Sequence, residues 1–259
     1  MLTAIRHTFY MARRYQLALI RQPIWIIVTL VQPVIWLLLF GALFSSIVEI
    51  PGFEATDYKQ FLTPGIVVMT ALFASGWSGM SMIEDMKRGV LDRFLVTPVR
   101  RGAVIGGRLM QDATSLALQS LIVVGLALLV GSTFPGGPLG VLVLIVIACF
   151  LGGAIAGFSN ALALVIRKEE SLIGLVQFVM LPLTFVSAAF MQPDLMPSWM
   201  QTVADFNPVN WAVVAGREAV MSESIDWGFV GIRLLGLAAL LAVATFAATR
   251  AFRAYQRSV

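Results

Sequence analysis

The sequence predicts an all-α membrane protein with six transmembrane helices, and three observations carry this prediction. Of the 259 residues, 59% are hydrophobic and 12% are charged, whereas a typical soluble domain has about 45–50% apolar and about 25% charged residues. The apolar residues gather in blocks of about 20, which is the length that a helix needs to cross a bilayer. These blocks are nearly continuous, whereas the strands of a membrane β-barrel alternate apolar and polar residues.

Residues 1–22 precede the first apolar block and mix arginines with apolar side chains. Phe9, Gln16 and Ile20 fall at helical spacing, so the segment has an interrupted apolar stripe. This pattern predicts an amphipathic helix at the membrane interface, with arginines that snorkel to the headgroups. A secretory signal peptide fits poorly, because the next apolar block is too long and no small-residue cleavage site follows it.

Six apolar segments follow and are interpreted as transmembrane helices over residues 24–44, 64–83, 109–130, 139–166, 171–190 and 228–248. Pro64 is expected in the first turn of the second span, where proline is tolerated. The fourth span would measure about 42 Å. We therefore expect it to tilt, or to bend near Gly152, Gly153 and Gly157. Gly153 and Gly157 also form a GxxxG pattern, which permits close helix contact.

The distribution of lysine and arginine predicts the orientation in the membrane. Fifteen of these residues lie at the N-terminus, in residues 84–108, after the fourth span and in the C-terminal tail, and two lie on the opposite face. The positive-inside rule therefore places both termini and residues 84–108 in the cytoplasm. The net charge of +4 reflects this topology, so we expect no nucleic-acid partner.

The sequence contains none of the common short motifs of phosphate-binding, hydrolytic or calcium-binding sites. Its one histidine, His7, and its one cysteine, Cys149, do not provide a thiolate cluster or a disulfide framework. There are two pairs of adjacent carboxylates, Glu84 with Asp85 and Glu169 with Glu170. Both stand at expected helix ends, where interaction with the helix dipole is more common than acid–base catalysis. We predict no catalytic residue, no metal site and no cofactor in this chain.

Several polar residues lie inside the apolar spans, where such groups mark pathways or helix contacts. They are Thr29, Gln32, Gln119, Ser159, Asn160 and Gln177. For each of them, a hydrogen bond between helices is the ordinary alternative to a functional role. Asp112 is expected one turn into the third span, where the helix N-terminus favours its charge. Arg233 is expected to snorkel toward the outer face.

The charged stretch at residues 84–108 contains a candidate helix over Met86–Val96, roughly 16 Å long and too short to cross the membrane. Pro98 ends it, because the residue before proline avoids the helical conformation. An apolar face flanked by arginines is formed by Leu91, Phe94, Leu95, Arg88 and Arg93. From the residues alone, a helix lying on lipid headgroups and a helix docked onto a cytoplasmic partner both remain open.

This stretch resembles the intracellular loop of ABC-2 type exporter permeases, the family of daunorubicin-resistance-like multidrug and lipid exporters. The shared pattern is carried by Glu84, Asp85, Arg88, Gly89, Leu91, Arg93, Phe94, Leu95, Thr97, Pro98, Arg100 and Arg101. Tyr58–Gly65 resembles the family's entry to the second span, and Leu181–Arg217 resembles its outer motif. Met86 and Lys87 depart from the pattern, since relatives more often carry further charges there.

The resemblance implies one transmembrane domain over residues 1–259 that pairs as a homodimer or heterodimer above two cytoplasmic ABC ATPase subunits, which would carry ATP and Mg²⁺. Residues 84–108 would form the coupling loop, with Arg88, Leu91, Arg93, Phe94 and Leu95 on a short coupling helix. Residues 191–226 would form re-entrant helices at the outer face. The protein would lie in the inner or plasma membrane of a prokaryote.

In this family the second and fifth spans of the two protomers face one another around a central cavity. Two helical stripes would line it here, formed by Met69, Phe73, Trp77, Gln177, Phe178, Leu181 and Phe185. Methionine and aromatic side chains can repack around ligands of different shapes. Ordinary packing remains the alternative for each single residue.

The expected function is therefore ATP-driven export of amphipathic drug-like or lipid-like molecules from the cytoplasm or the inner leaflet, with efflux of antibiotics as one form. A glycan carrier or an ion is the alternative cargo. A stand-alone secondary transporter is the rival from another class, and it predicts embedded charges and an internal repeat. Only Asp112 and Arg233 approach such charges. A membrane enzyme would need clustered catalytic residues, and none are seen.

Overall fold

The computed structural model describes residues 30–50, 55, 57–90 and 101–256, apart from the side chains of 101–104. Within these residues the chain is helical, with turns and short connections and no strand, so the all-α prediction is confirmed for this part of the chain. Among the described residues, four helices are long and apolar enough to cross a membrane, and they run over Tyr58–Lys87, Ile105–Leu129, Gly137–Ile166 and Trp227–Gln256. The predicted interfacial helix at residues 1–22 lies outside the described residues.

The first described helix covers Leu30–Leu43. It includes a π-helical turn, η1, at Trp36–Phe40, and α3 at Gly41–Leu43, and the 3₁₀ turn η2 follows at Ser45–Glu49. The later elements are α4 (Tyr58–Gly76), α5 (Ser78–Lys87), α7 (Arg101–Leu129), α8 (Gly137–Ile166), α9 (Glu169–Phe185), η3 (Pro193–Leu195), α10 (Ser198–Ala204), α11 (Pro208–Met221) and α12 (Trp227–Gln256).

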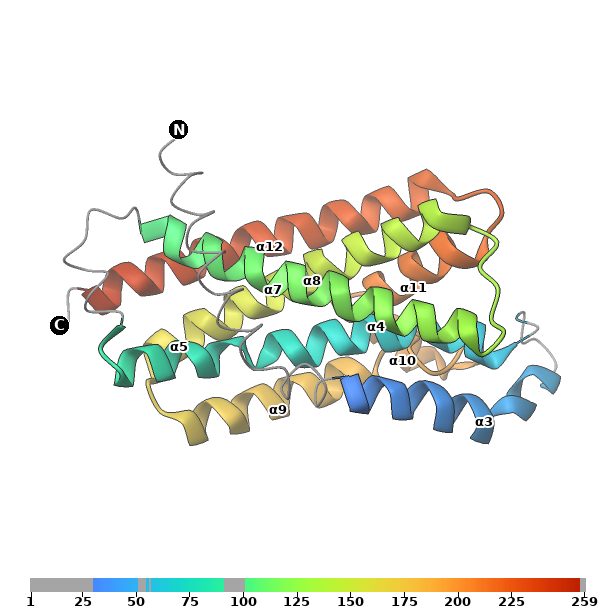
Figure 1. The fold of residues 1–259 in the computed structure, drawn as a ribbon, viewed down its shortest axis with the longest axis horizontal. Helices are drawn as coiled ribbons and strands as arrows, with labels where there is room; N and C mark the ends of the chain where they lie inside the picture. The colour runs from blue at the N-terminus through green and yellow to red at the C-terminus, as the bar shows by residue number, and fades with distance from the viewer. Residues whose placement is uncertain (1–29, 51–54, 56, 91–100, 257–259) are drawn as a thin grey trace.

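The long helices run roughly side by side, with α8 at the centre of the bundle (Figure 1). It packs against α4, α5, α7, α11 and α12. The end of α5, the start of α7, the end of α8 and the end of α12 gather at one end of the molecule (Figure 1). The turn between α7 and α8 lies at the opposite end, together with α10 and α11 (Figure 1).

The fourth predicted span is the helix α8, and it does not break at its glycines. A Cβ atom at Gly157 would lie 2.9 Å from the Cβ of Ala244, and one at Gly153 would lie 3.0 Å from Leu241. The glycines therefore allow α12 to approach closely, as the GxxxG pattern predicts. The helix is continuous through these small residues, and its one proline, Pro138, lies in its first turn. The tilt or bend of this span stays a prediction.

Several helix boundaries differ from the prediction. The second span begins at Tyr58, where Asp57 accepts a hydrogen bond of 3.0 Å from the backbone N–H of Lys59. Pro64 therefore lies inside α4 instead of in its first turn. α7 begins at Arg101, and α12 continues to Gln256. A helix satisfies its own backbone groups, so it can continue into charged sequence beyond the apolar block.

The helix of the second span is interrupted at Trp77, between α4 and α5. The hydroxyl of Ser159 on α8 bridges the interruption. It donates a hydrogen bond of 2.5 Å to the carbonyl of Gly76 and accepts one of 3.0 Å from the N–H of Gly79. All three residues are buried. A neighbouring serine thus pairs the backbone groups that the interruption would otherwise leave without partners.

The chain between α9 and α11 is held by polar side chains of the later helix. Asn207 caps α11 and donates hydrogen bonds to the carbonyls of Leu183 and Val186. The side-chain oxygen of Asn210 accepts a bond of 2.9 Å from the N–H of Ala188. The fifth span is helical only to Phe185 instead of Phe190, because the chain turns at Val186 into this segment.

The bridging role of Ser159 predicts that Ser159→Ala destabilises the protein by about 1–3 kcal/mol, because two buried backbone groups lose their partner. The check is the midpoint of thermal unfolding of the purified protein in detergent. Ser120→Ala is the matched control, since this buried hydroxyl bonds only the Leu116 carbonyl of its own helix. Equal midpoints for the two variants would contradict the bridging role.

Candidate functional site

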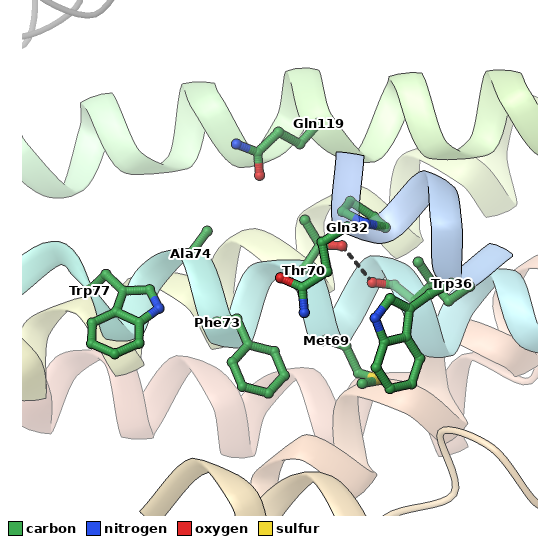
Figure 2. Close-up of a pocket in the computed structure, with 10 residues that line it drawn as sticks. Gln32, Trp36, Met69, Thr70, Phe73, Ala74, Trp77 and Gln119 are labelled. Atoms are coloured by element: carbon green, nitrogen blue, oxygen red, sulfur yellow. Dashed lines mark hydrogen bonds between the residues drawn. The ribbon is translucent and has the colours of Figure 1, made fainter. Parts of the chain in front are cut away.

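A pocket of about 120 Å³ opens between the helix Leu30–Leu43, α4 and α7, and we call it the inner pocket. Figure 2 shows its side chains converging from these three elements. It is lined by Gln32, Pro33, Trp36, Ile66, Met69, Thr70, Phe73, Ala74, Trp77 and Gln119. Aromatic rings and a thioether therefore form most of its wall, with two amides among them.

The polar groups of the inner pocket differ in what they already bind. The Thr70 hydroxyl donates to the Ile66 carbonyl at 2.8 Å within its own helix. The side-chain oxygen of Gln119 is buried and has no hydrogen-bond partner among the described residues. A buried acceptor without a partner costs free energy, unless a ligand or water supplies a donor. Gln119 thus places a buried acceptor without a partner behind the apolar wall of the pocket.

The structure brings together only one of the two predicted stripes. Met69, Phe73 and Trp77 line the inner pocket with residues of two other helices. On α9 the predicted residues face outward: Gln177 is exposed, and Phe178 and Leu181 are 79% and 46% exposed. Phe185, also largely exposed, lines a different pocket beside the outer segment. The buried side of α9 carries Leu172, Val176, Met180 and Thr184 instead.

Three residues line the inner pocket but were not part of the predicted stripes: Gln32, Trp36 and Gln119. Gln32 and Gln119 stand out in the sequence as amides inside apolar runs, and this signal is sound. Their place beside the second span is not visible in the sequence, because the helical period says which residues share a face and not which helices are neighbours. Trp36 carries no such signal in a run of apolar residues.

A buried polar cluster lies beside the interruption of the second span. Ser78 donates a hydrogen bond of 2.8 Å to the carboxylate of Asp112, and the amide of Asn160 donates one of 3.2 Å to Ser78. Asp112 is therefore well inside α7, which begins at Arg101, and not one turn from a helix start. The expected dipole interaction is wrong, and a hydroxyl donor takes its place. Arg233 lies over the ring of Phe229, 3.5 Å from its centroid.

The acidic residues of the predicted coupling stretch form ion pairs. Glu84 pairs with Arg88, and Asp85 pairs with the buried Arg108, which also donates a hydrogen bond of 3.0 Å to Ser81. Lys87 pairs with Glu169 at 2.9 Å and so links α5 to α9. Among the described residues, no group of three His, Cys, Asp or Glu side chains could hold a metal ion.

The helix predicted over Met86–Val96 does not begin at Met86. α5 ends at Lys87, and Gly89 adopts a φ of 64°, which is the left-handed conformation that ends helices. The sequence-based interpretation missed this glycine as a stop signal. Of the predicted coupling residues only Arg88 is described, since Leu91, Arg93, Phe94 and Leu95 lie outside the described residues.

Comparison with known proteins adds independent information. The family model of the ABC-2 type transporter matches residues 6–221. The chain is 32% identical to a daunorubicin resistance ABC transporter permease of Streptomyces coeruleorubidus, over 93% of this chain and 84% of the relative. It is 35% identical to a putative transport permease of Cyanophora paradoxa, over 81% and 72% of the two chains.

A probable doxorubicin resistance ABC transporter permease of Mycobacterium tuberculosis is 23% identical, over 82% of this chain and 76% of the relative. The apolar helices and these permease relatives together identify a multi-pass membrane protein. Membership of such a family implies association with an ABC ATPase and pairing of permease chains. The chain belongs to the ABC-2 type transporter family, as a membrane permease subunit of an ABC exporter.

Proposed function

We propose that this permease exports amphipathic molecules that combine fused rings with a hydrogen-bond donor. The observation that carries the proposal is the inner pocket, which Met69, Phe73 and Trp77 line together with Gln119, whose side-chain oxygen is buried and unpaired. The relatives named for resistance to daunorubicin and doxorubicin support this class of cargo. Lipid-like molecules share its chemistry, and a glycan carrier or an ion fits an aromatic wall less well.

The six-span topology, with both termini in the cytoplasm of a prokaryote, is part of the proposal. Helix α9 has 17 residues and measures about 26 Å, within about one turn of the roughly 30 Å hydrocarbon core. The helix Leu30–Leu43 would complete the first span together with residues 24–29. Residues 191–226 would form the re-entrant segment, and the polar contacts of Asn207 and Asn210 are consistent with non-helical backbone at membrane depth.

The proposed topology predicts the labelling of single cysteines in intact cells by an impermeant thiol reagent. In a Cys149→Ala background, Thr133→Cys and Ser198→Cys should be labelled from outside, because both positions are exposed at the proposed outer face. Glu170→Cys is equally exposed but lies at the proposed cytoplasmic face, so it should label only after lysis. Labelling of Glu170→Cys in intact cells would refute the orientation.

Two copies of a cytoplasmic ATPase are proposed to dock beneath a permease dimer and to bind the ATP and Mg²⁺. The chain would contact them through residues 84–108, and Leu91, Phe94 and Leu95 would provide the apolar contact. The ion pairs of Asp85 and Lys87 hold the start of this stretch against α7 and α9. An apolar anchor with flanking charge suits a small docking surface, where charge sets orientation more than affinity.

The docking role predicts that Phe94→Ala weakens association with the ATPase about 30-fold, since truncating a buried anchor can cost about 2 kcal/mol. Arg93→Glu should weaken association more at low salt than at high salt, because exposed charges are screened. The measurement is recovery of the ATPase with affinity-purified permease, combined with transport in reconstituted vesicles. Arg250→Glu, an exposed charge reversal on the tail, is the control. Wild-type recovery and transport for Phe94→Ala would defeat this mechanism.

The role of the inner pocket predicts that Gln119→Leu raises the daunorubicin concentration for half-maximal stimulation of ATP hydrolysis about threefold to tenfold. The reason is the loss of one hydrogen bond to the ligand, worth about 0.5–1.5 kcal/mol. Gln111→Leu is the matched control, because this amide lies on the same helix, bonds Ser115 at 3.2 Å and lines no described pocket. If both variants respond as the wild type does, the pocket is ordinary packing.

A secondary transporter, the rival from another class, would translocate daunorubicin without ATPase subunits. Reconstitution of the permease alone therefore discriminates the two classes. Transport that requires the ATPase and ATP supports the exporter, and transport driven by an ion gradient alone would support the rival.

A further inference from the structure

A second pocket of about 550 Å³ lies between the helix Leu30–Leu43, the start of α4 and the segment that follows α9, and we call it the outer pocket. Its wall includes the rings of Trp36, Phe40, Tyr58, Phe185 and Phe190 and the thioether of Met196. The turn η3 and the helix α10 also contribute to the wall. The outer segment therefore forms one side of the pocket, which is open where Phe185 is 64% exposed.

The rings of the outer pocket form a connected aromatic surface. Trp36 and Phe40 stack with ring centroids 4.5 Å apart, and Phe190 lies 5.5 Å from Trp36 and 6.0 Å from Phe40. The polar atoms nearby already have partners: the Tyr58 hydroxyl donates to the Phe190 carbonyl at 3.1 Å, and the Ser187 hydroxyl donates to the Thr184 carbonyl at 2.6 Å. What remains for a ligand is an apolar surface suited to flat rings.

The two pockets share a wall. Trp36 lines both the inner pocket and the outer pocket. It begins the π-helical turn η1, a local irregularity that is frequent at functional sites. The outer pocket has several times the volume of the inner one, at about 550 against about 120 Å³, and it falls in the range of about 300–1,000 Å³ that is typical of small-molecule sites.

We propose that the outer pocket is a second binding site, which holds the fused rings of the exported molecule after they pass Trp36 from the inner pocket. This inference rests on the proposed function. A lipid acyl chain and a second copy of this chain are the other possible occupants. The aromatic surface and the wall shared with an acceptor-bearing pocket favour a ring-bearing amphipath over either of them.

The test uses the purified permease–ATPase complex in nanodiscs of defined phosphatidylcholine, without nucleotide, and daunorubicin as the probe. Equilibrium dialysis should give two bound equivalents per permease chain for the wild type and one for Leu195→Trp, whose indole would fill the outer pocket from its rim. Val203→Trp is the matched control, since Val203 is an exposed apolar residue of α10 that does not line the pocket. It should still bind two equivalents.

Truncation of a wall residue provides a second variant. Phe185→Ala should weaken one of the two binding events about twofold to tenfold through loss of a ring contact. Phe206→Ala, a largely exposed phenylalanine of the outer segment that lines neither pocket, should change neither event. Both replaced side chains are largely exposed, at 64% and 79%, so neither change should unfold the protein.

The alternative results overturn the proposal in distinguishable ways. If the wild type binds one equivalent and the drug still stimulates hydrolysis, the outer pocket is not a binding site, and the proposed function is unaffected. Loss of a phospholipid from Leu195→Trp in native mass spectrometry, with daunorubicin binding unchanged, would assign the pocket to an acyl chain. Loss of the permease dimer in that variant would assign it to a second copy. Absence of both daunorubicin binding and drug-stimulated hydrolysis in the wild type would overturn both proposals.

Discussion

The arrangement of this bundle depends on the need to pair backbone polar groups wherever a helix stops inside an apolar environment. An unpaired N–H or carbonyl there has no water to bind. At the interruption of the second span, one hydroxyl on Ser159 serves both sides of the gap, bonding Gly76 and Gly79. After α9, the amides of Asn207 and Asn210 serve the same purpose for the outer segment. Both sets of contacts join elements distant in sequence, so they fix helix positions as well as satisfying the backbone.

These contacts also place the two pockets. Trp77, the residue at the interruption, directs its ring into the inner pocket (Figure 2). The guanidinium of Arg217 on α11 donates to the Ala188 carbonyl at 2.7 Å and lies over the Phe61 ring, 3.6 Å from its centroid. It thereby holds the segment that leads to Phe190 against α4. The segments that line the two pockets are thus held in place by polar contacts that lie outside the pockets.

Much of the fold could be predicted from the sequence, because continuous apolar runs have few structural alternatives. The start at Tyr58 has a sequence signal that was not used, since Asp57 is a good N-cap residue and accepts from the N–H of Lys59. The extension of α12 to Gln256 has no such signal, since a helix continues past its apolar block when nothing stops it. The same limit applies to the candidate site. The helical period placed Met69, Phe73 and Trp77 on one face, and they do share a pocket. Which helix faces them is a property of tertiary packing, so Gln119 entered the site only through the structure.

Helix α5 connects Trp77, at the inner pocket, to the stretch that is proposed to contact the ATPase. α5 is short, and it is tied to α7 through Asp85 and Arg108 and to α8 through Ser159. The ion pair is largely buried, so it resists screening by salt more than the exposed pair of Lys87 and Glu169 does. Because α5 is held at both ends, a displacement at Arg88 has to move either this buried pair or the interruption at Trp77. The interruption is held by the two hydrogen bonds of Ser159 and by the bond of 2.9 Å from the Met80 N–H to the Trp77 carbonyl, so a displacement there has to break buried contacts as well.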